Sequence, residues 1–252
     1  MKPSIYEPML MHEQPMLYLP QGGTDVIGCG IGPEWTRAGA GVVSHPTPTA
    51  GFTTQFRRTR ITSAASIDNE LGVHQPNVCA WRGNATSRGG FFFKARFLVN
   101  AIPNTAVRLF AGLSAQTATG VCISNTVPAN TVGLWCDAGD SGSLSVVTCN
   151  NAASATKNAL AAAHTITAGV LYEFLMICNP SQSIIVTQLN NVGTGAVIAS
   201  QNVAATMPDN ATFMAPQVGL SNAANAAGGD TVFDVYAIYL RPNLRLTPLG
   251  TP

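Results

Sequence analysis

The stretch WRGNATSRGGFFFKARFLVN, residues 81–100, decides the fold class. In a β-strand, successive side chains point to opposite faces of the sheet. One face of the strand predicted here is entirely apolar and is expected to lie in the core: Phe91, Phe93, Ala95, Phe97 and Val99. The other face is mixed, which is typical of a face only partly in contact with solvent: Phe92, Lys94, Arg96, Leu98 and Asn100. The glycines at 89 and 90 predict a turn or bulge that leads into the strand.

The same stretch has a second interpretation, because interleaved aromatic and basic side chains can form a platform for single-stranded nucleic acid. Such a platform needs further basic residues on the neighbouring strands, and we expect none there. The formal net charge of +1 also provides no electrostatic field for DNA, anionic lipid or an acidic substrate. The sequence therefore predicts no nucleic-acid binding.

Short apolar runs separated by turn residues continue from Phe52 to about residue 242. Examples are AVRLFAGLS at 106–114, YEFLMICN at 172–179 and TVFDVYAIYL at 231–240, and such runs alternate with clusters of Gly, Pro, Asn, Asp and Ser. This rhythm predicts an all-β fold, an antiparallel jelly-roll or lectin-like β-sandwich, as a display domain at 52–252. The alanine-rich segment ATKNALAAAHTI at 155–166 ends in β-branched residues, so we expect at most a turn or two of helix there.

Residues 1–51 differ in character and predict an extended N-terminal arm and linker. Prolines at positions 3, 8, 15 and 20 exclude a helix and keep the chain extended. Side chains with large apolar surfaces recur among them, and we predict that they attach the arm to a partner protein or to adjacent subunits: Tyr6, Met9, Leu10, Met11, Met16, Leu17, Tyr18 and Leu19. The alternative is a tail laid over its own subunit. The segment VSHPTPTAG at 43–51 predicts a stiff linker.

Charge is scarce in this chain, since 10% of its residues are charged, against about 25% in an average soluble domain. The long stretch from residue 101 to residue 230 contains seven charged residues: Arg108, Asp137, Asp140, Lys157, Glu173, Asp209 and Asp230. Such a surface is typical of a subunit that contacts other copies, and it predicts an oligomer. The six cysteines show no paired spacing and are expected to be small core residues.

The N-terminal sequence lacks the apolar run of a secretory signal, because Pro3, Glu7 and Pro8 interrupt it. No run elsewhere approaches the roughly 18 apolar residues that a membrane-spanning helix needs. We therefore expect a protein that is made in the cytoplasm and does not insert into a membrane.

Two segments resemble the catalytic segments of trypsin-like serine proteases: DAGDSGS at 137–143 and LAAAHTI at 160–166. In that family the histidine precedes the serine in the chain, whereas His164 follows Ser141 here. A turn between two strands needs Asp, Gly and Ser for backbone reasons alone. We therefore expect DAGDSGS to be a turn, although Asp137 and Asp140 could also contribute to a site for a hard cation.

The sequence nominates no other catalytic, cofactor or metal site. The four histidines, at 12, 45, 74 and 164, are scattered and lie in no metal-binding motif. No pair of acidic residues can be nominated for the facing carboxylates of a glycosidase. The expected protein is therefore not an enzyme and holds no cofactor or metal.

Several segments together resemble a β-rich domain of tailed-bacteriophage structural proteins, which are described as tail-fibre, head-fibre or other virion proteins. They are WRGNATSRGGFFFKARF at 81–97, RLFAGLS at 108–114, VGLWCDAGDS at 132–141 and VYAIYLRPN at 235–243. The resemblance covers about residues 75–242. It implies a jelly-roll or lectin-like sandwich that assembles as a homotrimer on the virion, in contact with capsid or tail proteins, after synthesis in the host cytoplasm.

The combined prediction is a non-enzymatic bacteriophage virion component, a surface-exposed fibre or spike protein that its N-terminal arm anchors. A host surface glycan is the candidate ligand, with Trp81 or Trp135 as candidate sugar-stacking residues. The alternative for both tryptophans is a place in the core. The alternative function is decoration or stabilisation of the capsid, and a more remote one is a glycan-degrading tail enzyme.

Overall fold

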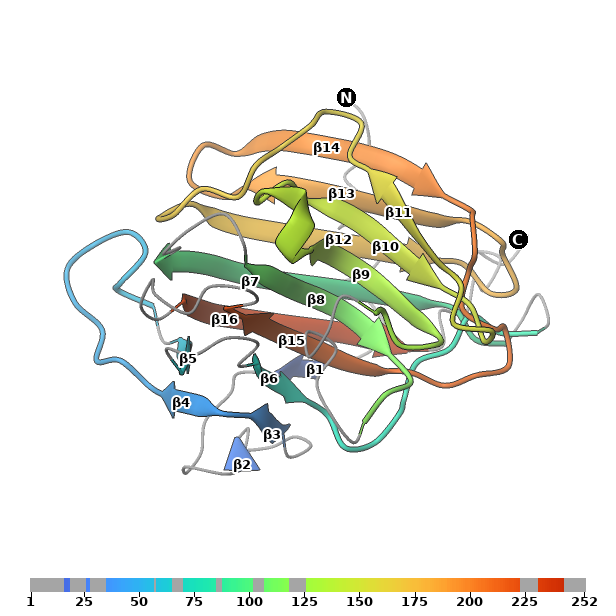
Figure 1. Ribbon diagram of the computed structural model, residues 1–252, viewed down its shortest axis with the longest axis horizontal. Helices are drawn as coiled ribbons and strands as arrows, with labels where there is room; N and C mark the ends of the chain where they lie inside the picture. Colours follow the sequence, from blue (N-terminus) through green and yellow to red (C-terminus); the bar gives the residue numbers. More distant parts are fainter. Residues whose placement is uncertain are drawn as a thin grey trace, which may run out of the picture.

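The computed structural model describes residues 16–18, 26–27, 35–56, 58–64, 70–84, 88–101, 107–117, 126–222 and 231–242. They form two antiparallel sheets packed face to face in a β-sandwich (Figure 1). The predicted all-β, lectin-like or jelly-roll class is confirmed. The one helical element among these residues is a 3₁₀ helix, η2 (Ala138–Asp140). Within the described residues, no helix is long and apolar enough to cross a membrane.

Sheet A has eight strands, and their order across the sheet differs from their order in the chain. From edge to edge it runs β14 (Ala196–Val203), β13 (Ile185–Asn191), β12 (Leu171–Cys178), β7 (Phe91–Ala101), β16 (Val232–Pro242), β5 (Thr59–Ser63) and β4 (Gly41–Ser44). The eighth strand, β1 (Met16–Tyr18), pairs with the C-terminal half of β16. Residues that are far apart in the sequence therefore lie side by side on this sheet.

Sheet B also has eight strands. Its order is β11 (Ala155–Ala159), β10 (Ser145–Cys149), β9 (Thr131–Cys136), β8 (Arg108–Ser114), β15 (Ala215–Ser221), β6 (Glu70–His74), β3 (Trp35–Gly39) and β2 (Val26–Ile27). Gly112 and Gly133 are paired residues of β8 and β9. A Cβ atom at Gly133 would lie 2.6 Å from Cε2 of Phe110, so only glycine leaves room for this ring.

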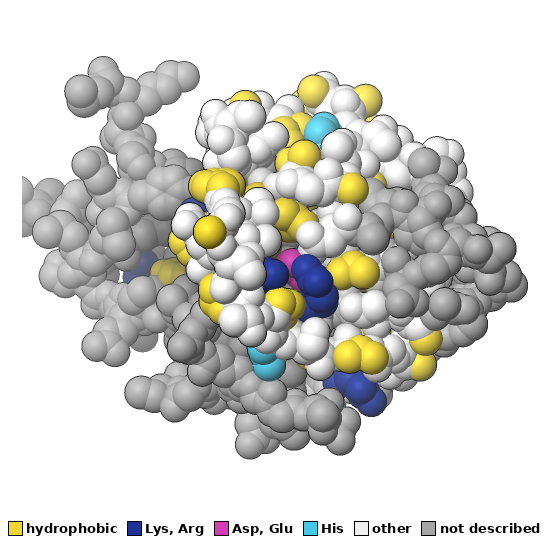
Figure 2. Space-filling view, turned by 90° about the vertical axis from the view of Figure 1, so that its left-hand side faces the viewer, with side chains coloured by type: hydrophobic (Ala, Val, Ile, Leu, Met, Phe, Trp, Pro, Cys, Tyr) yellow, Lys and Arg dark blue, Asp and Glu magenta, His cyan; other side chains and the backbone are white. Residues whose placement is uncertain are grey.

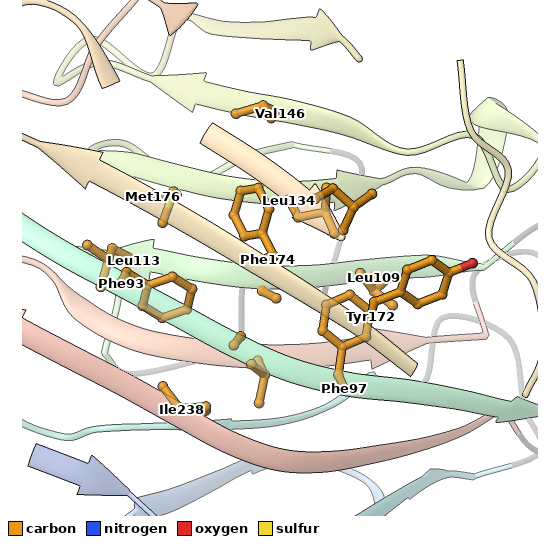
Figure 3. Close-up of a cluster of buried hydrophobic side chains, with 14 of the residues drawn as sticks. Phe93, Phe97, Leu109, Leu113, Leu134, Val146, Tyr172, Phe174, Met176 and Ile238 are labelled. Carbon is orange, nitrogen blue, oxygen red and sulfur yellow. The ribbon is translucent and has the colours of Figure 1, made fainter. Parts of the chain in front are cut away.

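The core lies between the two sheets, and the alternation predicted for β7 is confirmed. Phe93 and Phe97 are fully buried on the predicted core face. Figure 3 shows them pointing into the layer between the sheets, where Leu109 and Leu113 of β8 also lie. The ring of Phe97 stacks on that of Phe233, with 5.2 Å between the ring centroids. Each such phenylalanine contributes about 1.5–3 kcal/mol of stability through burial.

The sandwich begins earlier in the chain than the boundary predicted between residues 51 and 52. Strand β3 pairs with β6 in sheet B, and β4 pairs with β5 in sheet A, so residues 35–44 belong to the sheets. The chain passes from one sheet to the other through Gly39, which has a φ of +94°. A Cβ atom there would lie 1.9 Å from the carbonyl oxygen of Glu70. Gly39 thus marks a tight crossing between the sheets, in a region predicted as part of the extended arm.

The alanine-rich segment at 155–166 starts with a strand, since Ala155–Ala159 forms β11 at the edge of sheet B. Its backbone pairs with β10 over five residue pairs. The side-chain amide of Asn158 also donates to the carbonyl oxygen of Val146, at 3.1 Å. These ladder bonds outweigh the helix propensity of the alanines.

Four of the six cysteines lie in the described part of the chain, and all four are free thiols: Cys79, Cys136, Cys149 and Cys178. Three of them are buried, as expected for small core residues. Burial is the main cause that raises the pKa of Cys136, to about 12, and nearby Asp140 and Asp137 act in the same direction. Burial also raises the pKa values of Cys79 and Cys178 to about 11.

Candidate functional site

The DAGDSGS segment forms the turn that the sequence predicts. Asp137 caps helix η2, and its backbone N–H donates in return to Asp140 Oδ2 at 2.9 Å. The ammonium group of Lys157 lies 2.9 Å from Asp137 Oδ2 and 2.8 Å from Asp140 Oδ1. The two carboxylates therefore hold a cation supplied by the protein itself. Among the described residues, no group of three or more His, Cys, Asp or Glu side chains could hold a metal ion.

The second protease-like segment lies beside this turn, because Ser143 and Thr165 form an isolated antiparallel bridge. The ring of His164, however, is engaged by a residue of β12. His164 Nε2 lies 3.0 Å from the hydroxyl group of Tyr172, which also accepts a hydrogen bond from the backbone N–H of Thr167. Burial lowers the pKa of His164. This arrangement orders the segment around Tyr172.

A stacked pair of aromatic rings forms the first candidate site. Ala80 and Met214 form an isolated antiparallel bridge, which places Trp81 and Phe213 side by side. Their ring centroids are 5.0 Å apart and their planes differ by 18°. Phe213 is 43% exposed, and Trp81 is partly buried. The pair therefore presents aromatic surface to solvent at a defined position.

A polar cavity of about 460 Å³ is lined by Arg82, the residue that follows Trp81 in the chain. The other lining residues come from the β10–β11 turn and the β14–β15 loop: Asn150, Asn151, Ala152, Met207, Pro208, Asp209 and Asn210. Most of these side chains can donate or accept hydrogen bonds. The cavity and the aromatic pair together form what we call the loop site.

The loops around the loop site are braced against each other. Arg82 donates through Nη2 to the carbonyl oxygen of Gln182, at 2.7 Å, and through Nη1 to that of Pro208. Asn130 donates to Asn151 Oδ1 at 3.2 Å and accepts from the backbone N–H of Asp209 at 2.7 Å. These bonds link three separate turns, so the polar groups of the cavity have fixed positions.

The two tryptophans predicted as candidate glycan contacts have different surroundings. Trp81 lies at the loop site, where aromatic and polar groups meet. Trp135 is fully buried in a cluster with Phe110 and Val147, so it cannot stack on a ligand. Trp135 is buried, but it alternates with Leu134 and Cys136 of the core between the sheets, so its cluster lies on the outer face of sheet B.

The sequence did not reveal the other residues of the loop site. Phe213 lies far from Trp81 in the chain and stacks on it because the β14–β15 loop folds next to Ala80, and Asp209 of the same loop lines the cavity with Arg82. Phe213 follows a run of turn residues, MPDNAT at 207–212, which signals a loop but no partner. No local pattern identifies this contact.

The outer face of sheet A carries more charge than the sequence led us to expect. Strand pairing brings Arg60 of β5 and Arg241 of β16 onto the same face as Lys94 and Arg96 of β7. The expectation that basic residues are missing from the neighbouring strands is therefore wrong. The reason is that the neighbours of β7 come from distant parts of the chain. The absence of nucleic-acid binding stays a prediction.

Two carboxylates on this face each hold two cations. Asp234 lies 2.9 Å from Arg58 Nε and 2.8 Å from Arg60 Nε. Its hydrogen bond is the main cause that raises the pKa of Arg60. Figure 2 shows such a group at the surface, where basic side chains gather around an acidic one beside hydrophobic side chains.

The second carboxylate is Glu173 of β12, which accepts a hydrogen bond from Arg96 Nε and lies 3.8 Å from Lys94 Nζ. Burial lowers the pKa of Lys94, while the charge of Glu173 acts in the opposite direction. Each group of two cations and one carboxylate has a formal net charge of +1. This face is therefore electropositive.

The apolar residues predicted for attachment belong to the N-terminal arm. Tyr6, Met9, Leu10, Met11 and Leu19 lie outside the described residues. The remaining three, Met16, Leu17 and Tyr18, form β1 and pair with residues 238–240 of β16. This pairing places part of the arm on its own subunit, which is the alternative to attachment that the sequence leaves open. Attachment through the arm stays a prediction.

No protein-family model and no curated protein matches this sequence. Solved structures match the fold. A protein of unknown function from Shewanella oneidensis MR-1 is 12% identical, with a TM-score of 0.57 over 86% of this chain and 82% of that one. Peanut lectin, solved with a nine-residue peptide, is 12% identical, with a TM-score of 0.57 over 87% and 96% of the two chains.

The seed lectin of Lotus tetragonolobus is 11% identical, with a TM-score of 0.55 over 92% of this chain and 99% of the lectin. At such identities these similarities show the fold alone. The chain is thus a lectin-like β-sandwich.

Proposed function

We propose that this chain is a non-enzymatic structural subunit of a bacteriophage particle, displayed as an oligomer and binding a glycan of the host surface. The observation that carries the proposal is the loop site, in which Trp81, of a partly exposed aromatic pair, directly precedes Arg82, a lining residue of a braced polar cavity. The N-terminal arm provides attachment in this proposal, and the sandwich provides display.

The chemistry of the loop site supports a sugar ligand. A sugar ring has apolar C–H faces and a polar edge of hydroxyl groups, so a complementary site combines an aromatic surface with fixed donors and acceptors. Trp81 and Phe213 supply the aromatic surface. The donors and acceptors come from Arg82, Asn151 and Asp209. Because the loops are already braced, binding loses little entropy in ordering them.

Two features support display in an oligomer. The first is the low charge of residues 101–230, together with the sequence resemblance to tailed-phage structural proteins. The second is exposed apolar surface at one edge of sheet A, where Val186 of β13 is 44% exposed and Val197 of β14 is 57% exposed. An exposed apolar edge is suited to contact between subunits. The proposed assembly is a homotrimer.

Glycan binding is tested by screening the purified protein on an array of bacterial surface oligosaccharides and measuring the affinity for the best ligand. We expect Trp81→Ala to weaken binding at least tenfold, which corresponds to about 1.4 kcal/mol. Asp209→Asn keeps the oxygen that caps the backbone N–H of Ala211 but removes the charge, and it should also weaken binding.

Phe52→Ala is the matched control, because it truncates another half-exposed aromatic residue on a different element. It should leave glycan affinity unchanged. Binding that survives both loop-site substitutions, or the absence of any glycan ligand, would refute the glycan part of the proposal.

The particle part is tested by deleting residues 2–20 and following incorporation into phage particles. The deletion removes β1, which forms only three residue pairs at one edge of β16, so the sandwich should stay folded and soluble. We expect no incorporation. Normal incorporation would show that the arm is not the anchor. Crosslinking of the arm to a capsid protein would favour the capsid-decoration alternative, and sedimentation as a stable monomer would count against the trimer.

A further inference from the structure

A second cavity, of about 420 Å³, lies on the outer face of sheet A and shares no lining residue with the loop site. Its walls are mainly aromatic and aliphatic and include one guanidinium group: Phe52, Phe56, Leu171, Val192, Tyr236, Ala237 and Arg96. Its volume lies within the range of about 300–1,000 Å³ that is usual for small-molecule sites. We call it the sheet site.

The aromatic wall of the sheet site stands on a loop that is fixed to the sheet. The hydroxyl group of Tyr236 donates to the carbonyl oxygen of Thr53 at 2.6 Å, and Arg58 Nη1 donates to that of Thr54 at 3.0 Å. A bulge in β16 near Tyr236 aims its hydroxyl at the loop, because the register shifts between Val235 and Ala237. The wall is therefore held in place from the sheet below.

The two phenylalanines of this wall are exposed in a way that a folded chain normally avoids. Phe52 is 53% exposed and Phe56 is 49% exposed. Their rings meet edge to face, with 6.4 Å between the centroids. A braced pair of exposed aromatic side chains beside a cavity is typical of a surface that receives an apolar group.

The charge of Arg96, which lines the sheet site, and of its neighbours on the sheet favours an anion. The side chain of Arg96 is 43% exposed, that of Lys94 is 21% exposed, and Glu173, the carboxylate between them, is 7% exposed. Two cations therefore share one buried carboxylate. Within the described residues, Arg96 donates hydrogen bonds only through Nε. Its terminal Nη groups can bind a carboxylate or sulfonate in the bidentate manner that guanidinium groups favour.

We infer that the sheet site binds a small ligand that joins an apolar ring to one anionic group, with the ring against Phe52 and Phe56 and the anion on Arg96. This inference is independent of glycan binding at the loop site. It assigns the two cavities to ligands of different chemistry: a glycan at the loops and an anionic amphipathic ligand on the sheet.

Two fluorescent probes that differ only in a sulfonate group test the inference: 8-anilinonaphthalene-1-sulfonate and the neutral N-phenyl-1-naphthylamine. We expect both to bind the folded protein. Arg96→Gln should weaken the sulfonate probe about tenfold and leave the neutral probe within about twofold. Phe52→Ala combined with Phe56→Ala should weaken both probes at least tenfold.

Glu173→Gln gives a prediction of opposite sign, since it removes the negative charge that competes for Arg96. It should strengthen binding of the sulfonate probe several-fold without affecting the neutral probe. Trp81→Ala, which alters only the loop site, is the matched control and should change neither affinity. An equal effect of Arg96→Gln on both probes, or no effect of the double phenylalanine variant, would overturn the inference, as would the absence of sulfonate-probe binding.

Discussion

The outer faces of the two sheets follow the same alternation of residues, yet they differ in the side chains and cavities that they expose. The outer face of sheet A displays Arg96, the electropositive groups and the sheet site. On sheet B, the residues that alternate with the core residues are buried even where they are polar, as at Glu70, His74 and Gln217. Alternation thus identifies which side chains share a face, whereas exposure decides whether that face can meet a ligand.

The outer face of sheet B is closely packed around an aromatic pair. Phe110 and Trp135 meet edge to face there, with 6.3 Å between their ring centroids, and Gly112 and Gly133 leave the space that Phe110 occupies. The outer face of sheet A instead depends on carboxylates that each compensate two cations. Substitutions on the two faces should therefore act through different physical causes.

The largest effect is expected for Asp234→Ala on sheet A. This change leaves Arg58, whose side chain is only 5% exposed, without its carboxylate. An uncompensated buried charge costs about 3–5 kcal/mol, so the free energy of unfolding measured with urea should fall by that amount. Glu173→Gln is the comparison on the same face. Because its partner Arg96 is more exposed, we expect a loss of only about 1 kcal/mol. Equal losses of unfolding free energy in the two variants would show that burial of the cation does not determine the size of the effect.

A smaller loss is expected for Gly133→Ala on sheet B. The added methyl group would meet the ring of Phe110 at 2.6 Å and the carbonyl oxygen of Ala111 at 2.7 Å. Overpacking of this kind costs about 1–3 kcal/mol, to be measured by the same urea titration. Gly139→Ala in helix η2 is the matched control, since a Cβ atom there has no neighbour within 4 Å. If the two variants are equally stable, Phe110 does not require the glycine.

The smallest effect concerns the pH dependence that His74 adds to sheet B. Burial lowers the pKa of His74 below its usual value near 6.5. As the pH falls through that value, the unfolded chain takes up a proton before the folded one does, so stability decreases toward acid. One such residue contributes a slope of at most about 1.4 kcal/mol per pH unit.

Unfolding titrations between pH 7.5 and pH 5 should therefore show a shallower slope for His74→Gln than for the native chain. The variant's baseline stability does not matter, because the slope alone is compared. An unchanged slope would mean that His74 does not cause the pH dependence of stability. The outer face of sheet B would then not differ from that of sheet A in this respect.

Much of the fold could be predicted from the sequence, because local alternation determines which residues share a face. It assigned Phe93 and Phe97 to the core, and the turn residues between apolar runs indicated a sandwich. Residues 35–44 were predicted as part of the extended arm and linker, since a short strand and an extended arm have similar local sequences. Only the pairing of β3 and β4 with distant strands distinguishes the two.

The candidate sites could be predicted only in part, because they join residues that are distant in the chain. Arg58 and Asp234 are 176 positions apart, and Trp81 meets Phe213 across a comparable gap. A single sequence does not reveal such contacts when the order of the strands in the sheet differs from their order in the chain. Composition identified Trp81 as a candidate, but it gave the same weight to Trp135, whose burial depends on neighbours in β8 and β10.

The free thiols have a consequence for the life cycle of the proposed particle. Disulfide exchange proceeds through the thiolate, and the pKa values of Cys79, Cys136 and Cys178 are raised to about 11–12. At neutral pH the reactive form of these residues is therefore scarce. These three thiols are therefore slow to take part in disulfide exchange, whatever the redox state of the surrounding medium.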